Sequence, residues 1–407
     1  MDGTAAPSSA SALSSPAFRK YLCGNLVAYI GFRMQSMARA ILVFRTTGSA
    51  LDLGIVSAIA AVPAALFTIL GGVLADRCDT RLVWAANAGI SAAVVGLLGW
   101  MVFNATVSIG HTYALAAIMG VAAGVHASLG QAYFPSLVPE NALKSGVTFN
   151  TMSISMSSII GPTVAGLVIA AVDLHAAFAL AALCWSMPVL IVSALPARNT
   201  DPLKRSRTLD DFRFGLDFIL QNRLFLVLVA LSVANYLLVF GWLHTLPAFI
   251  DLFGGGEHEV GYAFTAAGIG ATVGILLAGR LKPGRYMAHQ ILAASTLFSA
   301  TVVVLSFAPS FYLVPLLAFF AHAGNGLFSA RGNIVLQSRT AEPVRGRVMG
   351  AIAVAFNLSS FSGMWTGAAI TLVGDVRLGM AVGPLIMLGI ILLFLATQRR
   401  IRTLTEV

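Results

Sequence analysis

Two arginines lie inside the first long apolar stretch of the chain. Arg33 falls near the middle of this stretch, and Arg39 follows six residues later, about 9 Å further along a helix. An arginine at the centre of a membrane span costs at least about 2.5 to 3.5 kcal/mol, so it needs a polar partner or a wet cavity. One hypothesis is that both guanidinium groups bind an anionic substrate such as a carboxylate, a catecholate or a phosphate. In the alternative, Arg33 bonds to nearby carbonyls or amides, and Arg39 reaches outward to Asp52 or the interface.

Titratable side chains are scarce at mid-depth. All 16 Asp and Glu residues fall in loops, tails or the edges of apolar segments. His126 and His322 lie at similar depths in two different apolar segments, and imidazole changes charge near neutral pH. Either histidine is therefore a candidate proton carrier, although a histidine inside a helix also serves as a packing residue. Asp52 and Asp76 are alternative titrating groups, with a gating role favoured for Asp76.

Amides and indoles supply further candidates for a substrate cavity. Amides orient a ligand, and indoles offer an apolar face with one donor. The same side chains also hold helices together in membranes, so both roles stay open. The candidates are Gln35, Asn150, Asn235, Trp242, Asn325, Asn357 and Trp365, with Asn25 and Gln131 in the same pool.

These residues belong to a chain that is 58% apolar and only 10% charged, with a mean hydropathy of +0.86. Soluble proteins have about 25% charged residues, so the composition indicates a polytopic membrane protein. Since a span needs about 20 apolar residues, the sequence predicts an all-α protein with twelve transmembrane helices. The expected spans are Leu22 to Phe44, Leu53 to Leu74, Leu82 to Phe103, His111 to Phe134, Val147 to Val172, Ala176 to Leu195, Phe225 to Ile250, Val260 to Leu281, Ala288 to Phe307, Phe311 to Val335, Val348 to Val373 and Leu378 to Ala396.

The net charge of +9 reflects membrane topology rather than binding of nucleic acid. Most of the 25 Lys and Arg residues fall on one side of the predicted membrane, whereas Arg45 and Arg377 fall in loops on the other side. The positive-inside rule then places both termini in the cytoplasm. The three cysteines are scattered, so they indicate neither a disulfide framework nor a metal site.

A long hydrophilic stretch divides the chain into two halves. The first residues are rich in Ser and Ala and lack the pattern of a removable signal peptide. The expected organisation is a disordered tail (1–16), a six-helix bundle (17–195), a cytoplasmic linker (196–223), a second six-helix bundle (224–398) and a cytoplasmic tail (399–407).

The linker is expected to contain an amphipathic helix along the inner membrane surface. Leu209, Phe212, Leu216 and Ile219 share one helical face, and Thr208 begins a capping box. A plain solvated linker is the alternative.

The two halves resemble each other. An offset of 203 residues superposes Gly71, Ala75 and Arg77 on the same residue types at positions 274, 278 and 280. Such a repeat predicts two bundles related by an axis along the membrane normal, with a substrate site near the midplane between them.

The loop between the second and third spans has the sequence GGVLADRCDTR at residues 71–81. Its glycines permit close helix contact, and Asp76 can accept N–H groups at a helix N-terminus. This loop resembles the signature loop of the major facilitator superfamily, with Asp in place of one Gly and Thr in place of one Arg. The resemblance implies a gate that involves Gly72, Asp76, Arg77 and Arg81.

The fifth span contains the run GPTVAG at residues 161–166. This run is similar to the Gly-Pro-x-x-Gly-Gly core of exporters in the same superfamily, with Ala in place of one Gly. Small residues permit tight contact, and Pro162 frees a carbonyl and bends the helix. Gly161, Pro162 and Gly166 are therefore expected to act in gating, although a packing kink also explains the run.

Three further stretches narrow the resemblance. TGSALDLG at 47–54, PSLVP at 135–139 and RGRV at 345–348 resemble the branch that contains the enterobactin exporter and related siderophore and drug efflux proteins. The resemblance covers essentially the whole chain. It implies a monomeric transporter of the bacterial inner membrane that exports a small, siderophore-like organic molecule or a drug, coupled to protons.

Other functions are also considered. An importer or facilitator of an anionic metabolite would use the two arginines equally well. A membrane enzyme or a sensor is disfavoured, because the histidines are dispersed and no soluble domain is visible. The sequence also has no Gly-x-x-x-x-Gly-Lys-Ser/Thr loop, which disfavours ATP-driven transport by this chain alone. No cofactor is expected, and the expected partners are a small-molecule substrate, protons and the lipid bilayer.

Overall fold

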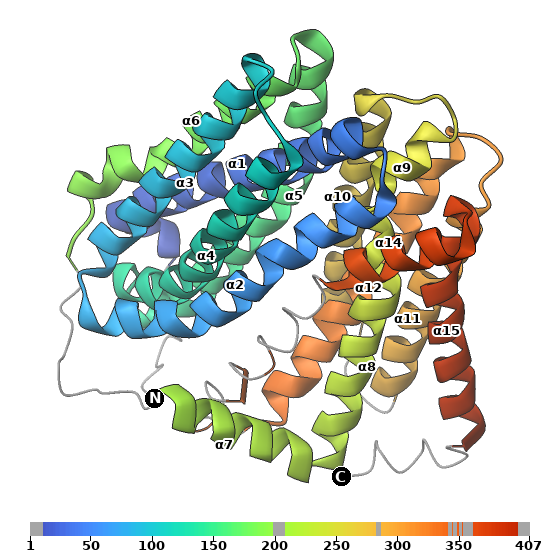
Figure 1. Ribbon diagram of the computed structural model, residues 1–407. Coiled ribbons are helices and arrows are strands. Elements are labelled where there is room, and N and C mark those ends of the chain that lie inside the picture. The colour runs from blue at the N-terminus through green and yellow to red at the C-terminus, as the bar shows by residue number, and fades with distance from the viewer. Residues whose placement is uncertain are drawn as a thin grey trace.

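The computed structural model describes residues 11–197, 208–281, 286–340 and 361–397, with positions 344, 348, 349 and 352. The described elements are α-helices and short 3-10 helices (Figure 1). The first half contains α1 (Pro16–Thr47), α2 (Ala50–Arg77), α3 (Thr80–Phe103), α4 (Ile109–Tyr133), α5 (Leu143–Ala171) and α6 (Leu174–Ile191). After α7 (Thr208–Gln221), the second half contains α8 (Arg223–Val239), η5 (Phe240–Leu243), α9 (Leu246–Asp251), α10 (Glu257–Arg280), α11 (Met287–Ser306), α12 (Leu313–Ser338), α14 (Ser362–Val373) and α15 (Val376–Thr397).

The helices form two bundles with matching internal contacts (Figure 1). In the first bundle α2 packs along α4 and α3 along α6; in the second, α10 packs along α12 and α11 along α15. Small residues allow the closest of these contacts. A Cβ on Gly124 of α4 would overlap the carbonyl of Ala64, and a Cβ on Gly274 of α10 would overlap that of Ala323. The expected pseudo-repeat of two bundles is therefore visible in the packing.

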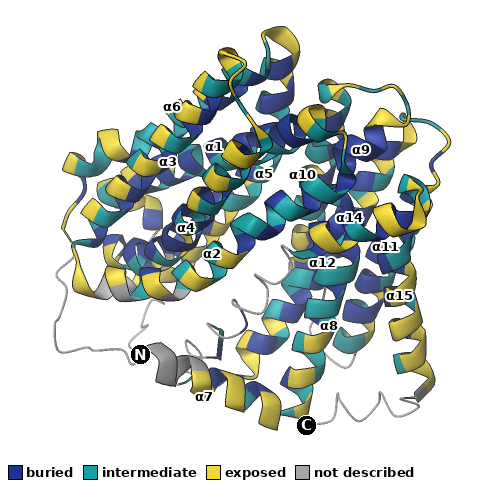
Figure 2. Ribbon diagram, in the orientation of Figure 1, coloured by how far each residue is buried: buried dark blue, intermediate teal, exposed yellow. Residues whose placement is uncertain are grey.

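Eleven of the described helices are long and apolar enough to cross a membrane, where the sequence predicts twelve spans. The remaining expected span, Val348 to Val373, lies partly outside the described residues, and α14 is its end. Exposed residues lie on the outward faces of both bundles (Figure 2). Many are large and apolar, such as Leu190 at 70% and Leu392 at 67% exposure. Such a surface fits contact with lipid tails rather than with water.

Short polar side chains set the ends of the first helices. The Ser15 hydroxyl accepts the N–H of Phe18 at 3.3 Å, and Pro16 occupies the first position of α1. Gly48 ends α1 at a φ of 62°, a conformation that glycine adopts without steric cost. Ser49 then caps α2 by accepting the N–H of Asp52 at 3.2 Å. These caps fix the tight turn between the first two spans.

The described residues begin at position 11, within the stretch 1–16 that the sequence predicts as a tail. Residues 12–14 form a 3-10 turn in which Ala12 is buried and donates its N–H to the Ser145 hydroxyl at 3.2 Å. The Ser15 hydroxyl donates to the carbonyl of Leu137 at 2.7 Å. These contacts place residues 12–15 against the first bundle. Residues 1–10 lie outside the described residues.

The expected continuous span Phe225 to Ile250 is broken into α8, η5 and α9. Pro247, at the start of α9, has no N–H to continue a helix. At the break, Gly241 lies so close to α14 that a Cβ would overlap the carbonyl of Ser362. The break therefore brings the backbone of this span against α14.

The linker contains the helix α7. Ile219 of α7 is buried against Phe225 and Leu336, whereas Leu216, which was expected on the same face, is 41% exposed. The buried face of α7 therefore differs from the predicted face: it contains Gly215 and Ile219, whereas Leu216 lies outside it. The side chains of Leu209 and Phe212 lie outside the described residues.

Candidate functional site

The two bundles meet through two pairs of helices, α5 with α10 and α2 with α14. We distinguish two ends of the molecule (Figure 1). The basic end carries α7 and the loop between α2 and α3, and the distal end carries the turns that precede α2, α6 and α10. The contacts between the bundles, described next, lie towards the distal end, and we call them the distal contact surface.

The first part of the distal contact surface joins α5 to α10 through small residues. A Cβ on Gly166 would lie 3.2 Å from the Cα of Gly261, so the two backbones touch. The hydroxyls of Thr163 and Thr265 are 2.7 Å apart and form a hydrogen bond between the bundles. Gly166, which the sequence assigns to gating, thus lies in this contact.

The second part joins α2 to α14 in the same way. Gly54 lies against the backbone of Gly363 and Met364, with no room for a Cβ. One turn further along α2, the hydroxyl of Ser57 lies 3.1 Å from Nδ1 of His244, which follows η5 in the other bundle. Small residues and one polar contact therefore recur in both parts.

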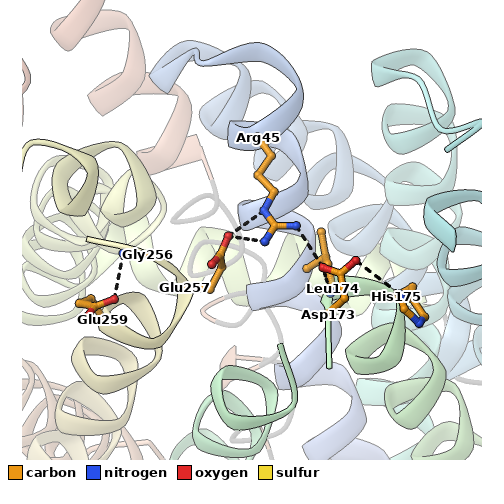
Figure 3. A network of polar contacts seen from close by, with 7 residues as sticks. All are labelled: Arg45, Asp173, Leu174, His175, Gly256, Glu257 and Glu259. Carbon is orange, nitrogen blue, oxygen red and sulfur yellow. Dashed lines mark hydrogen bonds and ion pairs between the residues drawn. The ribbon is translucent and has the colours of Figure 1, made fainter. Parts of the chain in front are cut away.

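An ion network closes the edge of this surface (Figure 3). Nε of Arg45, near the end of α1, donates to Oε1 of Glu257 at the start of α10 at 2.7 Å. Its Nη1 donates to Oδ1 of Asp173 at 3.3 Å, within its own bundle. The Leu174 N–H, together with Arg45 and His175, holds the pKa of Asp173 below its usual range. Arg45 thus links three elements, and only its pair with Glu257 joins the two bundles.

The basic end lacks comparable contacts in the part of the chain that is described. A Cβ on Gly72 of α2 or on Gly279 of α10 would have no atom within 4 Å. Arg81, a predicted gating residue, pairs with Asp79 at 3.2 Å and donates to the Leu195 carbonyl at 3.0 Å, all within the first bundle. Arg77 is exposed, and the side chain of Asp76 lies outside the described residues.

The predicted gating run in α5 contacts two elements. A Cβ on Gly161 would overlap Cβ of Arg33 on α1, whereas Gly166 touches the other bundle. Pro162 lies inside α5 between these two glycines. The run therefore connects the helix that carries Arg33 to the distal contact surface.

The two arginines of α1 have different surroundings. Arg33 is partly buried, its Nε has no hydrogen-bond partner, and its Cζ lies 5.9 Å from the Phe32 ring centroid. Arg39 lies within electrostatic range of His244 in the other bundle. Asp52, the alternative partner proposed for Arg39, instead accepts the hydroxyl of Tyr113 at 2.6 Å. Neither arginine forms an ion pair with a described carboxylate.

Both predicted proton carriers with imidazole rings lie among aromatic rings of their own bundle. His126 packs between Tyr29 at 5.0 Å and Trp185 at 5.3 Å, and neither ring nitrogen has a hydrogen-bond partner. His322 packs against Trp242 at 5.5 Å, and neither of its ring nitrogens has a hydrogen-bond partner. The structure does not bring the two histidines together.

Most of the remaining candidates make contacts inside one bundle. Asn150 accepts the Asn25 amide at 3.2 Å between α5 and α1, and Asn235 donates to the Ser295 hydroxyl at 2.5 Å between α8 and α11. Amides therefore join helices at both places.

The other candidates differ in exposure. Gln35 is buried and bonds weakly to Ser36, Asn325 is buried with its oxygen unpaired, and Trp365 is 38% exposed. Asn357 and the side chain of Gln131 lie outside the described residues.

Sequence reasoning missed the residues that bond across the bundles: Glu257, Ser57, His244, Thr163 and Thr265. The sequence held one weak indication of this network. Arg45 is one of two Lys or Arg residues that fall in loops on the non-cytoplasmic side of the predicted membrane. Its partner Glu257 lies 212 positions away, so sequence spacing did not indicate the pair.

Comparisons of the sequence point to exporters. The family model described as "Transmembrane secretion effector" matches residues 7–404. The chain is 26% identical over 376 residues to the enterobactin exporter EntS of Shigella boydii serotype 18, covering 88% of this chain and 82% of the relative. It is 25% identical over 375 residues to EntS of Escherichia coli O1:K1, with the same coverage.

Solved structures share the fold. A bacterial homologue of the lysosomal transporter Spinster, in an inward-facing and unoccupied conformation, has a TM-score of 0.71 at 13% identity and covers 96% of this chain and 97% of its own. The D-xylose-proton symporter has a TM-score of 0.70 at 16% identity, with coverages of 93% and 97%. These relatives are transporters and not enzymes, as the sequence predicts. The chain is a multi-pass membrane protein that belongs to the transmembrane secretion effector family of the major facilitator superfamily.

Proposed function

We propose that this protein exports a small anionic organic molecule, siderophore-like in chemistry, across the bacterial inner membrane. The observation that carries the proposal is the position of the bundle contacts, which lie at the distal end in a chain that is similar to enterobactin exporters over 88% of its length. Such contacts close one side of a site between the bundles and leave the other side free to receive substrate.

The transport cycle is alternating access. The basic end faces the cytoplasm with both termini, because cytoplasmic loops carry an excess of Lys and Arg. In the state described here the distal contact surface is closed. Binding of substrate from the cytoplasm is followed by closure at the basic end and separation of the distal contact surface, and the chain acts as a monomer.

Arg33 is the proposed anion site. Its partly buried guanidinium has an unpaired Nε, and none of the described carboxylates forms an ion pair with it. Because an unpaired charge inside a span is costly, an anionic substrate group would stabilise it. Arg39 is the second candidate, while Gln35, Asn325, Trp242 and Trp365 remain candidates for orienting the rest of the substrate.

Protons are the proposed driving ion. Asp52, His126 and His322 remain the proposed carriers, and the three have different surroundings. Asp52 is bound by the Tyr113 hydroxyl, whereas the two imidazoles lie among aromatic rings. Substrate efflux should then respond to an imposed pH gradient.

Counterflow in proteoliposomes tests this function. A panel of anionic siderophores, cationic drugs and neutral sugars is compared for wild type, Arg33→Gln and His322→Gln. We expect exchange of anionic compounds and a loss of at least tenfold in Arg33→Gln, with monodisperse protein as the folding control. Exchange of cationic or neutral compounds that Arg33→Gln leaves unchanged would contradict the anion site. Uptake into inside-out but not right-side-out vesicles is expected for an exporter, and the reverse would favour an importer of an anionic metabolite.

A further inference from the structure

His244 is a titratable group placed directly between the bundles, and it was not among the residues expected from the sequence. Its Nδ1 lies 3.1 Å from the Ser57 hydroxyl of α2. On its other side a Cβ on Gly363 of α14 would lie 2.9 Å from the Cβ of His244. The imidazole is therefore held between the backbone of its own bundle and a side chain of the opposite bundle.

The groups that face His244 suit a neutral ring better than a charged one. Arg39 of α1 is within electrostatic range, Ser57 of α2 offers a hydroxyl, and Phe240 of η5 lies 6.1 Å away between ring centroids. Within the described ranges no carboxylate forms an ion pair with His244. The nearest acid of α2, Asp52, is bound to Tyr113.

The hydrogen bonds fit the neutral ring. The Ser57 hydroxyl donates to the carbonyl of Leu53 at 3.0 Å, so its oxygen is free to accept the Nδ1–H of the imidazole. A second proton on the ring leaves this bond in place. It adds a positive charge near the like charge of Arg39 on the opposite bundle, with no ion pair to a described carboxylate, and a like charge nearby disfavours the charged ring.

Separation of the bundles lowers this cost, because Arg39 and His244 lie on opposite bundles and move apart. Conformations that bind a proton more easily gain population as the pH falls, by linkage. Imidazole in water titrates near pH 6.5, within the range that the outer surface of a bacterium meets.

We propose that His244 is a sensor of the pH on the distal side: protonation of its imidazole opens the distal contact surface. This proposal rests on the alternating access proposed above, since it needs a state in which the surface is separated. Acid outside the cell would then hold the transporter open to the outside.

Double electron-electron resonance in nanodiscs tests the proposal. The native cysteines are replaced (Cys23→Ser, Cys78→Ser, Cys184→Ala), and nitroxides are attached at Thr46→Cys and Leu252→Cys, two exposed positions on opposite bundles at the distal end. Between pH 7.5 and 5.5 the ratio of closed to open protein should fall about tenfold in the wild-type background. In His244→Gln it should fall less than twofold, and in Arg39→Gln by an intermediate factor.

His258→Gln is the matched control, since His258 is an exposed histidine at the same end of the molecule. It should keep the tenfold fall. A tenfold fall that persists in His244→Gln, or no fall in the wild-type background, overturns the sensor. A separate variant, Gly54→Leu, tests alternating access, because its larger side chain does not fit in the closed distal contact surface. If neither this variant nor substrate changes the distance between the nitroxides, the proposed function fails as well.

Discussion

The two ends of the bundle interface differ in how closely the backbones approach. At the distal end Gly54 and Gly166 leave no space between the bundles, and Thr163, Ser57 and Arg45 each bond across them. At the basic end Gly72 and Gly279 have no described neighbour within 4 Å, and Arg81 bonds only within its own bundle. The closed end thus combines small residues and a few polar bonds with a cluster of buried apolar residues drawn from both bundles.

This difference has a consequence for function. The glycines of the distal contact surface leave no room for a side chain, so this contact is sensitive to added volume. Changes at the distal end should therefore shift the balance between closed and open protein, and matched changes at the basic end should not.

The largest effect is expected from added volume at Gly54. Gly54→Leu overlaps the backbone of Gly363, and overpacking of this kind costs about 1 to 3 kcal/mol, which corresponds to a shift of about fivefold or more toward the open surface. Double electron-electron resonance between nitroxides at positions 46 and 252 measures this shift. Gly279→Leu, which meets open space, is the control. Equal distance distributions for Gly54→Leu and wild type would show that the distal contact does not close the molecule.

A smaller effect is expected from the ion network. Glu257→Gln removes the pair of Arg45 that joins the bundles. Partly exposed pairs contribute about 0.2 to 1 kcal/mol, so a shift of at most about fivefold toward the open surface is expected. Asp173→Asn removes the pair inside one bundle and should leave the distances unchanged. The double variant Arg45→Glu with Glu257→Arg should restore closure. If Asp173→Asn opens the surface as much as Glu257→Gln, the assignment of Arg45 to the closure is wrong.

The smallest effect concerns how the contribution of Asp173 to folding stability depends on pH. Its pKa is lowered, mainly by the Leu174 N–H, so its bonds stabilise the folded protein above its ordinary pKa near 3.9 and are lost as the pH falls below that range. The difference in melting temperature between wild type and Asp173→Asn should be constant from pH 7 to 5 and shrink below about pH 4. A difference that disappears well above that range would contradict the assignment to Asp173.

The fold followed from the sequence because long apolar runs have few alternatives to membrane helices. The interior arginines and histidines were also identified, since charge and imidazole stand out against apolar neighbours. The contact surface was not, because Ser57, Thr163 and Thr265 are ordinary residues in helices. Their role depends on which faces of two bundles meet, and a single sequence does not specify that. The break after Phe240 was missed for the same reason, although Pro247 marked its end.

The most direct measurement locks the distal contact surface. In the cysteine-free background, Thr163→Cys with Thr265→Cys replaces two hydroxyls that lie 2.7 Å apart on opposite bundles, so oxidation should join α5 to α10. Counterflow of the compound that the panel identifies is then measured with oxidised and reduced protein. The account predicts that oxidation abolishes exchange, that reduction restores it, and that either single cysteine has no effect. Exchange at the full rate through fully cross-linked protein would contradict alternating access at this surface.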